Sequence, residues 1–390
     1  MSGVKFGDVV KEVKVNIDRS HNPYEFYVAG DHMDSEDLTI RRKGRFVTDD
    51  VGPAFIRLFK PGQVLYGSRR TYLKKVAVAD FEGITANTTF VLETKDENVF
   101  LQKLLPFLML SDSFTEWSVK KSKGSTNPYV LFSDLADYEF NLPSLEEQRK
   151  LADLLWSAYD LKESYKRLLA ASDEMAKSRF VEMFGDNKMS PPKFPMKALG
   201  DLFKIGSSKR VLQSEQVGHG VPFLRISDLM LKIDNRLESP SLFISEEKYE
   251  SLRQDGYVPS PGDILITSRG TLGCCYIVQP EDQFYFQDGM ISWLSATDKS
   301  ISNVYIVSLF QQPEFKEQIN KMLAGTTVNY LSITMLKKIQ VVVPPLALQN
   351  EYAAFIEQLD KSKDALQKSI DRLDSVMKNL LNTTIERETT

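Results

Sequence analysis

The feature that most constrains the fold is an internal repeat. Segment 60–71 (KPGQVLYGSRRT) is matched by segment 260–271 (SPGDILITSRGT). A second match is shifted by one more residue, and in it Gly124, Tyr129, Pro143 and Gln148 correspond to Gly325, Tyr330, Pro344 and Gln349. Repeats of this kind decide the architecture before any local pattern does. Because each copy ends in a long polar and apolar stretch, we expect a molecule with an internal pseudo-two-fold.

The stretch that follows the first copy has the pattern of a long helix. Ser144 and Glu147 form a capping-box signal at its start, and Phe184-Gly185 marks its end. Such a helix would be about 60 Å long. Apolar or small side chains recur at steps of three and four, which indicates a heptad seam: Leu151, Leu154, Ala158, Leu161, Tyr165, Leu168, Ser172 and Met175.

The second copy ends in a similar stretch. Its predicted seam consists of Tyr352, Ile356, Leu359, Lys363, Leu366, Ile370, Leu373, Met377 and Leu380. Lys363 interrupts this seam and is open to two interpretations, a device that sets the register or a side chain that extends its ammonium to water. A linker with Pro191, Pro192 and Pro195 precedes the second copy. If the seams pair, the second helix must run back along the first, so we expect an antiparallel coiled coil.

These patterns predict an α+β fold with two globular mixed α/β domains joined by two long antiparallel coiled-coil helices. The expected segments are 1–143, 144–186, 187–344 and 345–390. Strand patterns lie at Val64–Tyr66, Val76–Val78 and Thr88–Leu92. Helical spacing covers 99–117, with a kink expected at Pro106, and 302–322, with an interruption at Pro313.

Bulk properties limit the class of protein. A length of 390 residues predicts more than one domain, and 42% hydrophobic with 26% charged residues is typical of a soluble globular chain. No apolar run reaches the roughly 18 residues that a membrane span needs, and the N-terminus lacks a signal-peptide pattern. The cysteines, Cys274 and Cys275, are adjacent and form no disulfide framework. We therefore expect a cytoplasmic protein with no membrane association.

Basic residues are unevenly distributed, although the formal net charge is −4. Residues 51–79 contain no acidic residue but include Arg57, Lys60, Arg69, Arg70, Lys74 and Lys75. Lys120, Lys121 and Lys123 form a second cluster just before Gly124. Local segregation of positive charge is compatible with a surface that binds nucleic acid.

The repeat and its helices carry a family resemblance. Segments 142–148 (LPSLEEQ) and 343–349 (VPPLALQ) are similar to the family's proline–leucine–glutamine motif at the start of its conserved helices, and 262–273 (GDILITSRGTLG) is similar to its central strand motif. Segment 199–209, the opening of the second copy, is also similar to the family pattern. The chain thus resembles the specificity subunit of type I restriction–modification enzymes. The first copy departs from the pattern, because Arg70 replaces the glycine found at Gly270, Tyr72-Leu73 replaces Leu272-Gly273, and its opening at 16–30 differs.

The resemblance implies a subunit without catalysis or cofactor. Each target-recognition domain would recognise one half of a split, asymmetric double-stranded DNA site. The helices would set the spacing and bind two adenine methyltransferase subunits, and motor–nuclease subunits would join for cleavage. The helix residues expected at these partner surfaces are Leu151, Leu154, Leu161, Leu168, Met175, Ile356, Leu359, Leu366, Leu373 and Leu380.

Candidate DNA contacts follow from side-chain chemistry. Forked donors suit base edges, and hydroxyls and backbone amides in glycine loops suit phosphates. In the first copy the candidates are Ser68, Arg69, Arg70, Thr71, Lys74, Lys75, Lys120, Lys121, Lys123, Ser125 and Thr126. In the second copy they are Ser208, Lys209, Arg210, Arg225, Ser268, Arg269, Thr271, Thr326, Thr327 and Asn329. The alternative is structural: the Ser-Arg pairs could serve the fold, the lysines a solvated loop, the glycine loops helix termination, and Arg225 a strand surface.

Other functions fit less well. Asn22-Pro23-Tyr24 and Asn127-Pro128-Tyr129 have one proline too few for an adenine-methylase signature. Asp80 with 93–95 could pass for a nuclease set, but the second copy lacks it. The three histidines, His21, His32 and His219, have no zinc spacing, and there is no phosphate loop. The alternative from a different class is a coiled-coil adaptor that binds protein or small ligands without DNA recognition.

Overall fold

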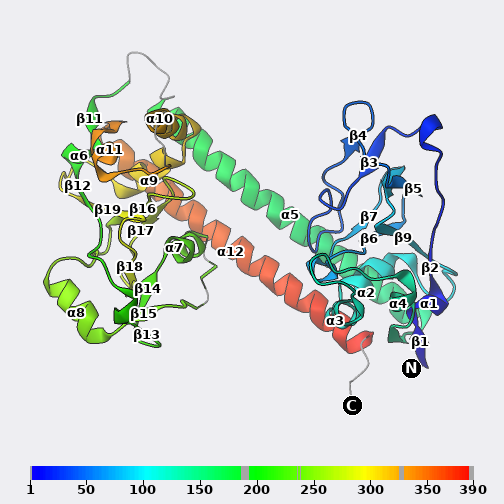
Figure 1. Ribbon diagram of the computed structural model, residues 1–390. Helices are drawn as coiled ribbons and strands as arrows, with labels where there is room; N and C mark the ends of the chain where they lie inside the picture. Colours follow the sequence, from blue (N-terminus) through cyan, green and yellow to red (C-terminus); the bar gives the residue numbers. More distant parts are fainter. Residues whose placement is uncertain (1, 186–192, 235, 238, 325–328, 386–390) are drawn as a thin grey trace. The chain divides into compact units, whose positions relative to one another are not determined.

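The computed structural model describes residues 2–185, 193–234, 236, 237, 239–324 and 329–385. Contacts divide the chain into a first unit, 1–167 with 366–390, and a second unit, 168–365. Each long helix contributes one half to each unit, so the division differs from the four consecutive segments expected above. Those segment boundaries stay a prediction. The two units are described separately (Figure 1).

The first unit builds its sheets around the repeated strand motif. One antiparallel sheet has the order β2-β9-β6-β7 and contains β2 (Val10–Glu12), β9 (Thr89–Thr94), β6 (Val64–Gly67) and β7 (Val76–Val78). A second sheet has the order β4-β3-β8-β5, with β3 and β8 parallel, and contains β4 (Gly44–Arg45), β3 (Phe26–Val28), β8 (Gly83–Ala86) and β5 (Phe55–Phe59). β1 (Ser2–Lys5) pairs with β10 (Glu139–Leu142). The strands predicted near Val64, Val76 and Thr88 are confirmed.

The second unit repeats this plan. Its sheet β12-β19-β16-β17 contains β12 (Phe203–Gly206), β19 (Ile291–Ala296), β16 (Ile264–Thr267) and β17 (Cys275–Ile277). The sheet β13-β15-β14-β18 contains β13 (Gln216–Val217), β15 (Phe243–Ile244), β14 (Val221–Leu224) and β18 (Tyr285–Phe286), with β14 and β18 parallel. β11 (Met196–Ala198) pairs with β20 (Gln340–Val342). The α+β class and the internal repeat are therefore confirmed. The copies differ at the edges of the second sheet, because β5 extends it beside β8 in the first unit, whereas β13 extends it beside β15 in the second.

Short helices cover these sheets. Those of the first unit are α1 (Phe6–Val9), α2 (Leu105–Leu110), α3 (Asp112–Lys121) and α4 (Phe132–Ala136), with 3-10 turns η1 (Arg19–His21), η2 (Thr71–Leu73) and η3 (Gln102–Leu104). Those of the second unit are α6 (Leu199–Leu202), α7 (Ile226–Ile233), α8 (Glu246–Gln254), α9 (Asn303–Gln311), α10 (Pro313–Leu323) and α11 (Ile333–Lys338), with the turn η4 (Gln213–Glu215).

The kink expected at Pro106 is wrong in its position. Pro106 lies in the first turn of α2, where a missing N–H is tolerated, and the helical stretch breaks at Ser111 instead. The Ser111 hydroxyl accepts a hydrogen bond from the N–H of Phe114 and so starts α3. In the second unit, Pro313 likewise opens α10 after the break at Gln312.

Two long helices carry the rest of the chain, α5 (Leu145–Phe184) and α12 (Leu346–Thr384). The capping box of α5 is confirmed, because Ser144 and Glu147 exchange hydrogen bonds between the side chain of each and the backbone N–H of the other. The predicted end of α5 is also confirmed, since Gly185 follows it with φ of 89°. Among the described residues, no helix is long and apolar enough to cross a membrane.

The seam predicted for α5 is displaced by one residue. Leu154, Leu161, Leu168 and Met175 are 43–55% exposed, whereas Leu151 is buried and Ala158, Tyr165 and Ser172 are partly buried. The buried positions include Ala152, Leu155, Tyr159 and Phe180, which follow one another at steps of three, four and twenty-one residues (three heptads). Adjacent leucines at 154 and 155 allow either choice from the sequence, and packing selects the second.

The seam of α12 lies where the sequence predicts it. Tyr352, Leu359 and Ile370 are buried, and the intervening positions of the predicted set are partly buried. In the second unit, Arg179 pairs with Glu351 at 2.9 Å and Asp173 pairs with Lys363 at 2.6 Å, so α5 and α12 run antiparallel there. In the first unit, Lys162 pairs with Asp374. Lys363 therefore contacts the facing helix rather than only extending into water.

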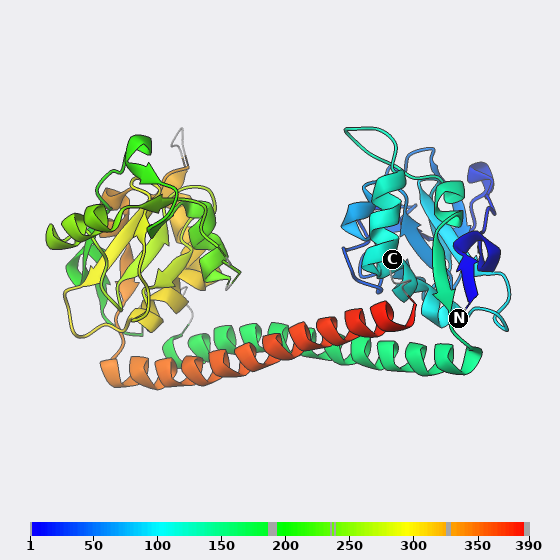
Figure 2. The same cartoon turned by 90° about the horizontal axis from the view of Figure 1, so that it is seen from below.

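The α/β part of each unit packs on one side of its own stretch of the helix pair (Figure 2). In the first unit, Leu155 and Tyr159 of α5 and Leu381 of α12 join the same core as the sheet and α2. In the second unit, the rings of Phe180 and Tyr352 lie 5.5 Å apart, and Phe180 stacks on Tyr305 at the same distance. The helices are thus part of each hydrophobic core.

The repeated glutamines explain why the motif at the start of each helix is duplicated. Gln148 is fully buried, accepts from the N–H of Leu101 at 3.0 Å, and donates to the carbonyls of Val99 and Pro143. Gln349 makes the same set with the N–H of Ser302 and the carbonyls of Ser300 and Pro344. Each side chain satisfies three backbone groups and so ties a long helix to its domain.

Candidate nucleic-acid interface

In the first unit, the interface begins where β6 ends. The hydroxyl of Ser68 is buried and donates to the carbonyl oxygen of Thr88 at 2.6 Å. Arg69 and Arg70 follow with exposed side chains. Arg70 has φ of 49°, in the left-handed region that a side chain rarely adopts, and the turn η2 comes directly after it. The local backbone therefore turns the two arginines out of the sheet.

The glycine loop of the same copy returns to this turn. The N–H of Arg70 donates to the carbonyl of Pro128 at 2.7 Å, and the N–H of Val130 donates to the carbonyl of Ser68 at 3.0 Å. Lys123 and Tyr129 close the loop with two backbone hydrogen bonds. Two motifs that are far apart in the sequence thus form one continuous surface, which we call the first arginine surface (residues 69, 70, 120 and 123–129).

The charges of this surface are partly satisfied within the protein. Lys123 pairs with Asp134 at 2.9 Å. Burial raises the pKa of the Asp134 carboxyl, but the hydrogen bond and the charge of Lys123 lower it by more. The pKa of Asp134 therefore lies below its ordinary value. Lys121 lies 4.7 Å from the Trp117 ring. Arg69, Arg70 and Lys120 are exposed and have no ion-pair partner among the described residues, which leaves them able to contact an anionic ligand.

Several candidates from the first copy lie elsewhere. Ser68 and Thr71 are buried, so their side chains serve the fold in this structure. The Lys74 ammonium pairs with Glu36 and Asp112 and lies in a cavity away from the arginines. The Lys75 ammonium donates to the Gly30 carbonyl. Ser125 and Thr126 are exposed at the tip of the glycine loop.

In the second unit, the described residues that follow the glycine loop contact the end of the strand motif in a similar way. The N–H of Leu331 donates to the carbonyl of Ser268 at 3.0 Å, which matches the bond from Val130 to Ser68. The guanidinium of Arg269 lies 5.0 Å from the centre of the Tyr330 ring. Ser268 is buried and shares a hydrogen bond with Ser292, whereas Thr271 and Asn329 are exposed. Thr326 and Thr327 lie outside the described residues.

The remaining candidates of the second copy divide into buried, paired and exposed groups. Ser208 is buried and donates to the carbonyl of Phe286. Lys209 is 3.4 Å from Asp255, and Arg210 is exposed. Arg225 pairs with Asp228, which raises the pKa of the guanidinium, and also donates to Ser241. Arg225 therefore holds the start of α7.

The structure also gives roles that the sequence did not. Tyr129 and Tyr330 were visible as repeated residues, but only the fold shows that each lies beside the repeated arginine. Lys43 lies 3.7 Å from the centre of the Phe26 ring, next to Arg42 and Arg45, which pair with Asp34 and Glu25. The sequence signal for this basic segment, residues 41–45, was the run Arg41-Arg42-Lys43.

The described residues hold no cluster that could bind a metal ion.

Comparison with known proteins places these features in a family. The family model described as "Type I restriction modification DNA specificity domain" matches residues 56–170 and 191–374. The chain belongs to this type I specificity family. The two matched regions contain both arginine turns and both glycine loops, and they confirm the resemblance drawn from the repeated motifs.

Individual relatives of the specificity family are distant. A specificity subunit of the type I restriction enzyme MjaIX from Methanocaldococcus jannaschii is 25% identical over 89% of this chain and 82% of its own length. A putative specificity subunit, S.HindORF215P, from Haemophilus influenzae is 26% identical, but the match spans only 44% of this chain and 42% of that relative. Sequence similarity of this level supports the family and not the individual contacts.

Solved structures share the fold. A type I restriction–modification S subunit from M. genitalium gives a TM-score of 0.59 at 16% identity and covers the whole chain and 96% of its own. A chain from a study of complex assembly and conformational transition in a type I system gives a TM-score of 0.56 at 19% identity, covering 98% and 97%. These likenesses show that the fold is that of the specificity family.

Proposed function

We propose that this chain is a non-catalytic DNA-recognition subunit in which each α/β domain recognises one half of a split, asymmetric site. The observation that carries the proposal is the paired surface in each unit. In the first unit, the exposed Arg69 and Arg70 lie beside the glycine loop and Tyr129, and in the second unit the exposed Arg269 lies beside Tyr330. Arginine forks suit guanine edges in the major groove, and the loop amides and hydroxyls suit phosphates.

Differences between the copies support an asymmetric site. The position after the repeated arginine is Arg70 in the first copy and Gly270 in the second. At this position, a side chain that can donate to bases is therefore present on the first surface and absent from the second. Two domains with the same scaffold but different exposed donors would prefer different sequences.

The long helices are the proposed surface for partner subunits. Leu154 and Leu161 in the first unit, and Leu168 and Met175 in the second, are spaced by seven residues and exposed. Such a pattern suits contact with another helix. We propose that two adenine methyltransferase subunits bind here and that motor–nuclease subunits join the assembly. Because the DNA that such a subunit recognises is in the cytoplasm, the proposal includes that location.

A methylation assay tests this function. The chain is combined with its methyltransferase subunits, and DNA methylation is measured on duplexes with a randomised sequence. The proposal predicts methylation that depends on two separated blocks of sequence. Methylation that does not depend on a split site, or DNA binding that is independent of sequence while other proteins still bind the helices, would favour the coiled-coil adaptor instead.

A further inference from the structure

Backbone strain is concentrated at one place in the first unit. Among the described residues, the non-glycine residues with positive φ are Glu36, Arg70 and Lys74, with φ values of 56°, 49° and 47°. They are connected: the N–H of Glu36 donates to the carbonyl of Lys74 at 3.1 Å, and Lys74 closes the turn η2 that Arg70 opens. Left-handed side chains are unfavourable and persist where surrounding structure holds them, often at functional sites.

The second copy builds the same turn with glycine. Both hairpins are closed by matching hydrogen bonds, from the N–H of Gly67 to the carbonyl of Lys75 and from the N–H of Thr267 to the carbonyl of Cys274. This register pairs Arg70 with Gly270 and Lys74 with Gly273, and both glycines have positive φ. The equivalence of Lys74 with Gly273 also corrects the ungapped alignment, which paired Leu73 with Gly273. The first copy therefore keeps side chains at two positions where glycine is the less strained residue.

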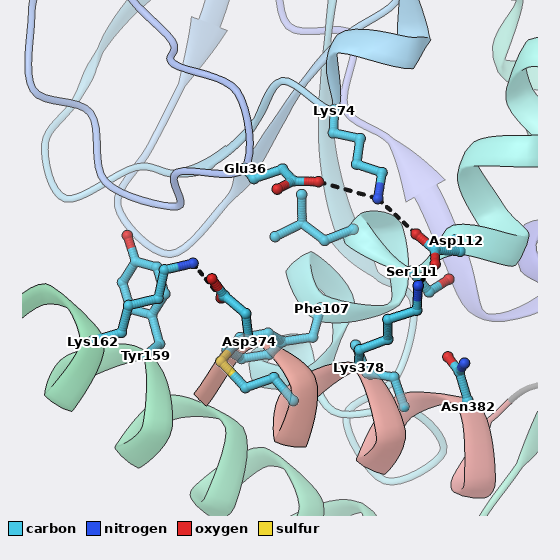
Figure 3. Close-up of a pocket in the computed structure, with 13 residues that line it drawn as sticks. Glu36, Lys74, Phe107, Ser111, Asp112, Tyr159, Lys162, Asp374, Lys378 and Asn382 are labelled. Atoms are coloured by element: carbon cyan, nitrogen blue, oxygen red, sulfur yellow. Dashed lines mark hydrogen bonds and ion pairs between the residues drawn. The ribbon is translucent and has the colours of Figure 1, made fainter. Parts of the chain in front are cut away.

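The side chain at position 74 has a defined use. Its ammonium lies 2.8 Å from one oxygen of Asp112, and the other oxygen of Asp112 lies 2.5 Å from the ammonium of Lys378 on α12 (Figure 3). Burial by itself lowers the pKa of Lys74, but its bonds to Asp112 and Glu36 outweigh this and raise the pKa. These groups border a cavity of about 250 Å³ between the turn, the start of α3 and the long helices.

Helix α3 connects this cluster to the first arginine surface. Asp112 is the first residue of α3, and Lys120 lies in its last turn. The loop that follows α3 supplies Pro128, whose carbonyl accepts from the N–H of Arg70. The turn is thus held at two ends, by Pro128 beside Arg70 and by Asp112 beside Lys74.

We propose that Lys74, Asp112 and Lys378 form an ion-pair anchor that positions the Arg69–Arg70 turn against α12. The anchor would sharpen discrimination at the half-site that the first domain recognises. This inference rests on the proposed function and adds positioning residues that do not touch DNA. The second unit lacks the anchor, because Gly273 stands in place of Lys74 and α10 begins with Pro313 where α3 begins with Asp112.

The test uses the full chain with its methyltransferase subunits and the site defined by the methylation assay. Discrimination is the ratio of DNA affinities for the cognate duplex and for duplexes substituted in one half-site. Lys378→Met should lower discrimination at one half-site about three- to tenfold and leave the other within about twofold. Lys378→Arg should keep most of the discrimination, because it retains the charge. Lys368→Met on the same helix removes an ammonium that has no ion-pair partner among the described residues and should change neither ratio.

A second background separates positioning from a general electrostatic effect. In Arg70→Gly, one of the two arginines that the anchor positions is absent, so Lys378→Met should have a clearly smaller further effect on discrimination. Equal losses at both half-sites, an undiminished loss in the Arg70→Gly background, or unchanged discrimination in a folded Lys378→Met protein would overturn the anchor. If the unsubstituted chain shows no sequence discrimination at all, the proposed function itself fails, and the anchor fails with it.

Discussion

The backbone N–H of Arg70 donates a 2.7 Å hydrogen bond to the carbonyl of Pro128, and this bond joins two motifs that the sequence separates. One motif ends a central strand, and the other follows helix α3. Because the bond uses only backbone atoms, it leaves the guanidinium of Arg70 exposed. The fold therefore fixes the position of the turn while the side chain remains available to a ligand.

Replacing Arg70 with glycine should separate stability from recognition. Glycine adopts positive φ without strain, so Arg70→Gly should raise the free energy of unfolding by about 1 kcal/mol or leave it unchanged. The same change should weaken sequence discrimination by the first domain, because the forked donor is lost. Chemical denaturation and DNA affinity measure the two effects. The reciprocal control, Gly270→Ala, should lower stability by about 1 kcal/mol, since alanine would be strained there.

Arg69 and Lys120 should contribute to DNA binding through charge. Replacing either with alanine should weaken DNA binding and reduce the slope of log affinity against log salt, by about 1 for each phosphate contact that is lost. Fluorescence anisotropy at several salt concentrations measures the slope. Lys150→Ala provides the control, because this lysine pairs with Glu146 on α5 and lies outside the arginine surface. Equal slopes for all three variants would argue against the surface.

The repeated glutamines should be structural. Gln148→Ala would leave the N–H of Leu101 and two carbonyls without buried partners, and we expect a loss of about 3 kcal/mol in unfolding free energy. Gln349→Ala should behave in the same way in the second unit. Because the two residues lie in separate units, their effects should add in the double variant. A loss below about 1 kcal/mol in either variant would contradict this role.

Adjacent leucines on α5 should respond in opposite ways to a charge. Leu155 is fully buried in the core of the first unit, so Leu155→Glu should cost about 4 kcal/mol or more. Leu154 is 55% exposed, so Leu154→Glu should leave the unfolding free energy nearly unchanged while it weakens methyltransferase binding. Denaturation and co-purification with the partner measure these outcomes. A destabilised Leu154→Glu protein would show that the seam lies where the sequence pattern first suggested.

The ion-pair anchor should make stability depend on pH through Asp112. Lys378 and Lys74 hold the pKa of Asp112 below its ordinary value of 3.8. A carboxyl with a lowered folded-state pKa contributes stability above the unfolded value, and this contribution is lost as the pH falls through the folded value. The stability difference between the unsubstituted chain and Asp112→Asn should therefore be constant from about pH 5 to 8 and shrink below about pH 4. Denaturation curves across this range measure it, and a difference that grows in acid would contradict the assignment.

The sequence predicted the repeat, the strands and the long helices because each rests on a local pattern. The displaced seam on α5 shows where local pattern is insufficient: residues 154 and 155 are both leucine, and only packing decides which is buried. Lys74 is a similar case for the site. It lies in an acid-free basic segment, but its partners Asp112 and Lys378 come from distant segments that only the fold brings together. The arginines were identifiable because an acid-free basic segment and the repeat coincide there.

The most direct test of split-site recognition is to compare methylation motifs of variants in each domain on one randomised duplex library. The unsubstituted complex should give two different blocks separated by a spacer of fixed length. Arg70→Gly should degrade one block only, and Arg269→Ala should degrade the other, with the spacer unchanged. A single continuous motif, or the loss of the same block in both variants, would contradict recognition of one half-site by each domain.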